Sequence, residues 1–143
     1  MEIIPRVGLD ILKLGLTADE VINSLGVPTK DSRDEFEDRF MCYHGKGIAV
    51  RFEDGNDNRV GWIIVSNPSV TLYGIQPIGM DIDTVINHLE QHLNEKIDID
   101  DFDDSTSRTF EDSWVEVQET LGFVQQINIG VPYDDKDNPL WPE

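Results

Sequence analysis

The chain has 143 residues, 38% of them hydrophobic, which is enough to build the core of one ordinary domain. Its 29 acidic and 11 basic residues give a formal net charge of −18, which disfavours binding to nucleic acid phosphates and to anionic membrane surfaces. A single cysteine excludes an internal disulfide, and the first residues lack the pattern of a signal peptide, so we expect a cytoplasmic protein.

The first predicted helix covers residues 17–25. Thr17 and Glu20 have the spacing of a capping box, in which each side chain accepts a hydrogen bond from the other residue's backbone amide. Gly26 provides a residue that can end the helix in a conformation with positive φ. The helix is short, so it must pack on another element to be stable.

Three strands are predicted after this helix. The charged segment 31–39 precedes them and indicates either a loop or a solvated helix. Alternation of apolar and polar residues then predicts strands over 40–44, 47–53 and 59–66. The Asp- and Asn-rich segment 54–58 predicts the turn of a hairpin between the last two strands.

A second helix is predicted over residues 81–94, where apolar residues recur at helical spacing. The segment 97–104 is dominated by aspartate and predicts an acidic loop. Three short strands are expected after it, over 108–111, 114–119 and 123–131. The tail, 132–143, contains three prolines and predicts irregular structure.

Residues 11–25 resemble residues 75–89, which lie 64 positions later and are identical at seven of fifteen aligned positions. A self-match of this kind indicates an internal repeat. The sequence therefore predicts an α+β fold of two tandem repeats, 1–74 and 75–131, each a helix followed by an antiparallel meander. The helices would pack on one face of the sheet, and the two repeats would form one compact domain.

The motif Gly-Leu-Thr-x-x-Glu-Val-x-x-x-Leu-Gly-x-Pro over residues 15–28 is similar to the helix start of the SmpA/OmlA family of outer-membrane assembly lipoproteins. The strand patterns at 47–52 and 60–63 match that family as well. In tandem, such a unit resembles the β-lactamase inhibitory protein. That resemblance implies a sheet backed by helices, with a concave face that binds another protein. In general character the chain also resembles small, acidic bacterial toxin-immunity proteins.

Two groups of residues are candidates for contact with a protein partner. Trp62 and Trp114 lie in predicted strands, where aromatic side chains serve either in the core or as anchors on an exposed sheet face. An electronegative patch for a basic partner is predicted at Asp98, Asp100, Asp101, Asp103 and Asp104. A solvated acidic surface that only maintains solubility is the alternative.

No pattern in the sequence requires a cofactor. His88 and His92 are four residues apart on the second helix, with Glu95 one turn further, which permits a metal-dependent enzyme. The spacing differs from that of the zinc proteases, and two surface histidines without a metal are the simpler interpretation. The aspartates that begin at Asp101 have part of the spacing of a calcium loop but lack its glycine and its terminal glutamate.

These observations favour a non-enzymatic, acidic protein-binding module of the immunity or inhibitor type, which would neutralise a basic protein partner. The alternatives are a structural or assembly module that binds without inhibiting, a mimic of DNA, and a metal-dependent enzyme that uses His88 and His92.

Overall fold

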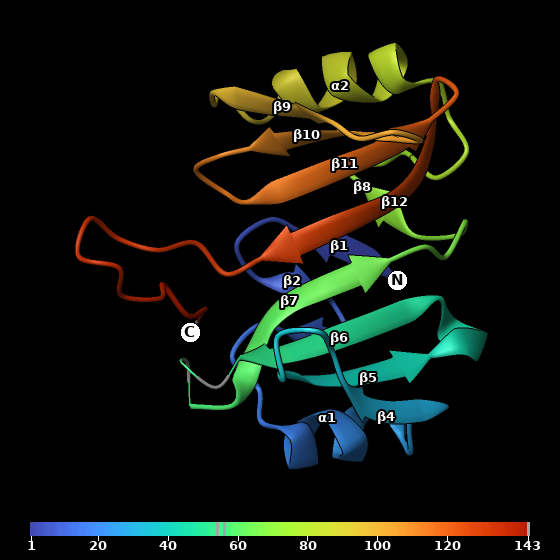
Figure 1. Cartoon of the computed structure of the whole chain (residues 1–143). Helices are drawn as coiled ribbons and strands as arrows, with labels where there is room; N and C mark the ends of the chain where they lie inside the picture. Colours follow the sequence, from blue (N-terminus) through green and yellow to red (C-terminus); the bar gives the residue numbers. More distant parts are fainter. Residues whose placement is uncertain (54, 56, 143) are drawn as a thin grey trace.

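The computed structural model describes residues 1–53, 55 and 57–142, and within these residues the chain forms two sheets and two α-helices (Figure 1). The helices are α1 (Ala18–Leu25) and α2 (Ile82–Glu90). In spatial order, the large sheet contains β4 (Lys30–Arg33), β5 (Arg39–Tyr43), β6 (Ile48–Glu53), β7 (Arg59–Val65), β12 (Phe123–Gly130), β11 (Val115–Thr120), β10 (Thr106–Phe110) and β9 (Ile97–Asp101). The small sheet contains β3 (Leu12–Lys13), β2 (Gly8–Leu9), β1 (Glu2–Ile4) and β8 (Thr71–Leu72).

Both helices begin at side-chain caps. The capping box of α1 is present: the Glu20 amide donates to Thr17 Oγ1 at 3.3 Å, and the Thr17 amide donates to Glu20 Oε1 at 3.1 Å. At the start of α2, the Thr84 amide donates to an Asp81 carboxylate oxygen at 3.1 Å. These caps satisfy amides that have no partner inside the helix, so they fix where each helix begins.

Each helix precedes four antiparallel strands, β4 to β7 after α1 and β9 to β12 after α2. The two groups join where β7 pairs with β12, with Ile63 opposite Ile129 and Trp62 opposite Gly130. This pairing places the last strand of one group beside the last strand of the other. A continuous eight-stranded sheet results, and its edges are β4 and β9.

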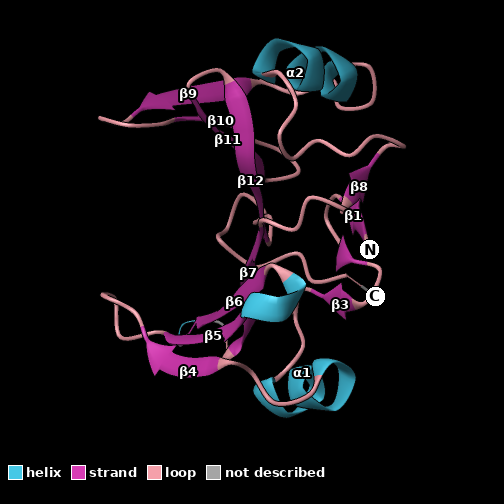
Figure 2. Ribbon diagram, turned by 90° about the vertical axis from the view of Figure 1, so that its right-hand side faces the viewer, coloured by secondary structure: helices cyan, strands magenta, loops and turns pink. Residues whose placement is uncertain are grey.

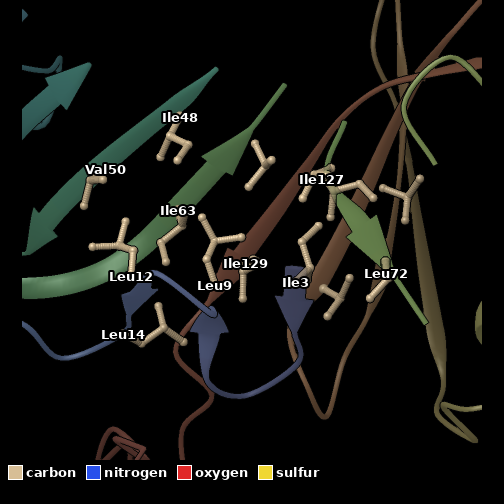
Figure 3. Packing of buried hydrophobic residues seen from close by; sticks show 14 of the residues in the cluster. Ile3, Leu9, Leu12, Leu14, Ile48, Val50, Ile63, Leu72, Ile127 and Ile129 are labelled. Carbon is tan, nitrogen blue, oxygen red and sulfur yellow. The ribbon is translucent and has the colours of Figure 1, made fainter. Parts of the chain in front are cut away.

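The main core lies between the two sheets (Figure 3). Ile3, Leu9 and Leu12 of the small sheet are at most 2% exposed and face apolar side chains of the large sheet. The labelled partners in the large sheet are Ile48, Val50, Ile63, Ile127 and Ile129. The small sheet therefore covers the middle of the large sheet, and α1 and α2 flank it on the same side (Figure 2).

The expected fold class is wrong. The chain is mostly β, with 42% of residues in strands and 15% in helices, rather than an α+β layer of two helix-plus-meander repeats. The helices do not cover the sheet alone, because β1, β2, β3 and β8 form a second sheet over its centre. Three of these four strands are only two residues long, so they carry no periodicity that a sequence pattern could reveal.

Three local expectations also differ from the structure. The charged segment 31–39 contains most of β4 and the first residue of β5, and the expected acidic loop 97–104 begins with the edge strand β9. The second helix ends at Glu90 rather than at 94. A run of charged residues predicts a loop, whereas an edge strand of a sheet also tolerates charged residues. Residues 54 and 56 of the predicted hairpin turn lie outside the described residues.

Leu9→Ala tests the contribution of the small sheet to stability. Leu9 has no exposed surface, so we expect its truncation to lower the free energy of unfolding by about 2–5 kcal/mol. Ile11→Ala in the same segment is the matched control, because Ile11 is 43% exposed and its truncation is expected to cost about 0.5 kcal/mol or less. Urea unfolding measures both variants. Equal effects of the two would contradict a core between the sheets.

The edge strand β4 is held to β5 by an ion pair with a predictable pH dependence. Arg39 donates two hydrogen bonds to the Asp31 carboxylate, at 3.1 and 2.7 Å, and these lower the pKa of Asp31. A lowered pKa stabilises the fold above the ordinary aspartate pKa of about 3.9, and this stability is lost as the pH falls through the lowered value. Both side chains are 38% exposed, so water and salt weaken the pair.

We therefore expect Asp31→Asn to destabilise the protein at neutral pH by less than about 1 kcal/mol. The difference from the unchanged protein should shrink in acid, as the Asp31 carboxylate becomes protonated. Urea unfolding midpoints of both proteins, measured across this pH range, provide the test. A difference that stays constant in acid would show that the ion pair does not contribute.

Candidate functional site

One face of the large sheet is left uncovered by the helices and the small sheet. Figure 2 shows the large sheet edge-on: β9 and β10 at one end, and β4 and β5 at the other, both bend away from α1, α2 and the small sheet. The uncovered side is therefore the hollow side, which we call the concave face. An exposed and hollowed sheet face is a surface that can receive part of another molecule.

Strand register determines which side chains point to the concave face. Met41, Val50 and Ile63 are buried on the opposite, core-facing side, so their neighbours along each strand face outward. One row across the concave face contains a residue from every strand of the large sheet, in order Lys30, Cys42, Ala49, Ile64, Asn128, Glu116, Thr109 and Asp98. This row has a lysine at the β4 end and an aspartate at the β9 end.

A cavity of about 290 Å³ lies on the concave face where β6, β7 and β12 meet, and we call it the Trp pocket. Trp62 comes from β7 and Trp114 from the turn between β10 and β11. The residues that line it are Arg51, Glu53, Gly61, Trp62, Trp114, Gly130, Val131 and Tyr133. The structure thus brings the two predicted tryptophan anchors together in one site.

Gly130 makes room for both indole rings. A Cβ at this position would lie 2.7 Å from ring atoms of Trp62 and closer still to Trp114. Any side chain here would displace the rings, so the absence of a side chain on β12 is what creates the pocket floor. Sequence reasoning missed Gly130, although a glycine at the end of an apolar strand is a known sign of close approach by another group.

Arg51 forms one wall of the Trp pocket. Its guanidinium carbon lies 5.6 Å from the ring centroid of Trp62, within the range of a cation–π contact. It also pairs loosely with Glu53 at 3.7 Å and with Asp34 at 3.9 Å. Tyr133 from the C-terminal tail donates a hydrogen bond to Glu53 at 3.2 Å. Arg51, Glu53 and Tyr133 were not predicted as site residues, because they meet only in three dimensions.

Trp114 has an unusual backbone conformation. Its φ is +56°, in the left-handed region that glycine and asparagine favour, and a bulky residue there costs about 1 kcal/mol or more. Its amide donates to Phe110 O at 2.8 Å, and its carbonyl accepts from the Gly130 amide at 3.0 Å, so the turn holds this conformation. The indole is nevertheless 41% exposed. Core packing alone does not account for a strained and exposed tryptophan.

Next to the Trp pocket, the concave face carries a fixed polar network. Asn128 is only 4% exposed and donates to Glu116 at 2.8 Å, while Gln126 donates to Asn128 at 3.1 Å. These bonds link β12 to β11 through their outward side chains. The network holds the amide and the carboxylate in defined positions, which is typical of a surface that is organised before binding.

The predicted acidic patch lies at the far edge of the concave face. Asp98 and Asp100 belong to β9 and share the outward face of their strand, because their partners Thr109 and Ser107 do. Asp101 is the last residue of β9 and accepts from the Thr106 hydroxyl at 2.9 Å. Asp103 and Asp104 follow in the turn to β10 and are exposed. β9 is four strands from β7, about 19 Å at the usual strand spacing, so this patch lies well away from Trp62 on the same face.

His88 and His92 have structural contacts in α2 and the segment after it. His88 Nε2 lies 2.7 Å from the carbonyl oxygen of Tyr73, and the ring of His92 stacks on the ring of Tyr73 at 4.1 Å. Glu95 accepts from the Ser113 amide at 2.7 Å. Among the described residues, no three histidine, cysteine or acidic side chains are arranged to hold a metal ion.

No known protein family matches the sequence, and no curated protein is significantly similar to it. In structure, the chain is similar to an extracellular protein containing a SCP domain from Bacillus anthracis str. Ames. The TM-score is 0.52 and the sequence identity is 10%, over 86% of this chain and 44% of that one. The chain thus spans less than half the length of that protein, and at this identity the similarity concerns the fold alone.

This comparison corrects two expectations. The resemblance to the SmpA/OmlA family and to the β-lactamase inhibitory protein is wrong, because the structural similarity is to the SCP-domain protein and the chain is mostly β. The structural neighbour is described as extracellular, which contradicts the expected cytoplasmic location. In the described part of the chain, no helix has the length and apolar character needed to cross a membrane.

Gly130→Ala tests how the Trp pocket is formed. The added methyl group would overlap Trp62 and Trp114, so we expect both indoles to move and the tryptophan fluorescence and near-ultraviolet circular dichroism to change. Gly45→Ala is the matched control, because a Cβ there meets nothing within 4 Å and its φ is not positive. Unchanged spectra for Gly130→Ala would contradict the close approach of the two rings to β12.

Proposed function

We propose that the chain is a non-enzymatic protein-binding module of the inhibitor type, and that a basic protein partner binds on its concave face. The observation that carries this proposal is the Trp pocket, where two tryptophans from distant parts of the sequence meet on an uncovered sheet face. Aromatic side chains in a hollow surrounded by polar groups are the usual centre of a protein–protein interface.

The strain at Trp114 supports this assignment. A positive φ at a large, exposed residue costs folding free energy, and such strain is common where a side chain is held in position for binding. Gly130 also supports this assignment, because a side chain at this position would close the pocket. Both features disfavour the interpretation of Trp62 and Trp114 as ordinary core residues.

The charge of the chain supports a basic partner. The net charge is −18, and the β9 edge of the concave face carries outward aspartates at positions 98 and 100. A basic partner would be drawn to this surface, and the acidic edge would orient it before the aromatic residues make contact. A structural or assembly module would use the same surface, but its partner would stay active when bound.

The first step of the test is capture of proteins from a lysate of the source organism by the immobilised chain, followed by elution in a salt gradient. We expect a basic protein in stoichiometric amount that is released at high salt. Its activity is then measured with and without the chain. Loss of that activity supports an inhibitor, whereas an active complex indicates an assembly module.

Variants identify the surface that binds the captured protein. We expect Trp114→Ala to weaken the affinity by about 30-fold, as for a central anchor residue. Asp98→Asn with Asp100→Asn should slow association and reduce its salt dependence. Asp83→Asn with Glu90→Gln is the matched control, since these exposed carboxylates belong to α2 on the opposite side of the sheet. A Trp114→Ala variant that binds normally would contradict the proposed face.

A further inference from the structure

The three tryptophans of this chain differ in whether a cation lies over the indole ring. Arg51 lies over Trp62 with its guanidinium carbon 5.6 Å from the ring centroid, and Arg59 lies over Trp141 at 5.7 Å. Trp114 has no such cation among the described residues. It is also the tryptophan with the most exposed side chain, at 41%.

Trp114 lines a second cavity besides the Trp pocket. This cavity, of about 330 Å³, shares Trp114 and Tyr133 with the Trp pocket, and we call it the Trp114 cavity. Its lining residues are Arg6, Glu111, Asp112, Trp114, Tyr133 and Leu140. It combines two aromatic rings, one aliphatic side chain and two carboxylates with a single basic group. Tyr133 is 45% and Leu140 44% exposed, so this apolar surface is open to a partner.

We propose that the Trp114 cavity binds an arginine side chain of the basic partner, an inference that rests on the proposed function. A guanidinium is planar and weakly hydrated, so it stacks on an aromatic ring at a smaller desolvation cost than the ammonium of lysine. The ring of Trp114 offers such a face, and Tyr133 lines the same cavity. Leu140 gives the aliphatic stem of the arginine an apolar surface.

The carboxylates distinguish this cavity from a purely apolar one. Glu111 and Asp112 line it beside Trp114, and they outnumber the one basic residue, Arg6. The same combination already exists within the chain, where Arg51 lies over Trp62 and pairs with Glu53 at 3.7 Å. In the Trp114 cavity the ring and the carboxylates are present, Arg6 is not placed over the indole, and the arginine over Trp114 would come from the partner.

The inference is tested without the partner, by titration of the complete chain with a short probe peptide. The probe is acetyl-Gly-Arg-Gly-amide, and its neutral counterpart contains citrulline in place of arginine, which keeps the shape and removes the charge. The readout is the NMR signal of the indole N–H of Trp114, assigned by its disappearance in Trp114→Phe. We expect a saturable shift of this signal with the arginine peptide and about three- to fivefold weaker binding of the citrulline peptide.

Two double variants separate the carboxylates of the cavity from the overall charge. Glu111→Gln with Asp112→Asn should weaken the binding of the arginine peptide severalfold and leave that of the citrulline peptide unchanged. Asp83→Asn with Glu90→Gln removes the same charge from α2 and should change neither. A Trp114 signal that does not move, equal binding of both peptides, or equal effects of the two double variants would overturn the inference.

These outcomes are separable from those of the proposed function. If the arginine peptide binds at Trp114 but the captured partner binds Trp114→Ala normally, the concave face is not the interface and the proposed function fails. If the partner requires Trp114 while the two peptides bind equally, the proposed function stands and the arginine assignment fails.

Discussion

The pairing of β7 with β12 sets both the core and the open face of the large sheet. It joins two four-stranded groups through their last strands, with Ile63 opposite Ile129 and Trp62 opposite Gly130. Because strand side chains alternate between faces, this one register sends the isoleucines into the core and leaves Trp62 over a glycine on the other side. A shift of one residue would exchange the two faces. The same strand register therefore determines both the core and the candidate site.

The small sheet decides which face remains open. Its buried leucines at positions 9 and 12 occupy the centre of the core-facing side, and the two helices flank it there. In the described part of the chain every covering element is on that side, so the opposite, hollow side has no layer of its own. Most exposed sheet faces of this kind are polar. Here the face holds aromatic rings and buried polar groups, which is why it is the candidate binding surface.

The fold concentrates part of the acidic charge at particular places on the surface. Outward aspartates of β9 stand at one edge of the concave face, and carboxylates also line the cavity next to Trp114. Two arginines already lie over tryptophan rings of the chain, Arg51 over Trp62 and Arg59 over Trp141. A net negative charge with its own cations placed on tryptophans is consistent with a surface suited to cationic groups.

The features that could be predicted from the sequence are those that depend on residues close together in the chain. Two of these features are local, the Thr17 capping box and the alternation in β6 and β7. The charge balance follows from the composition. Tryptophans 62 and 114 were also candidates from the sequence alone. The tertiary structure decided everything that depends on distant pairing: the small sheet of two-residue strands, the strand nature of 97–101, and the mostly β fold class. It also decided that Trp114 and Gly130 meet beside Trp62, because only the register of β12 against β7 and β11 brings them together.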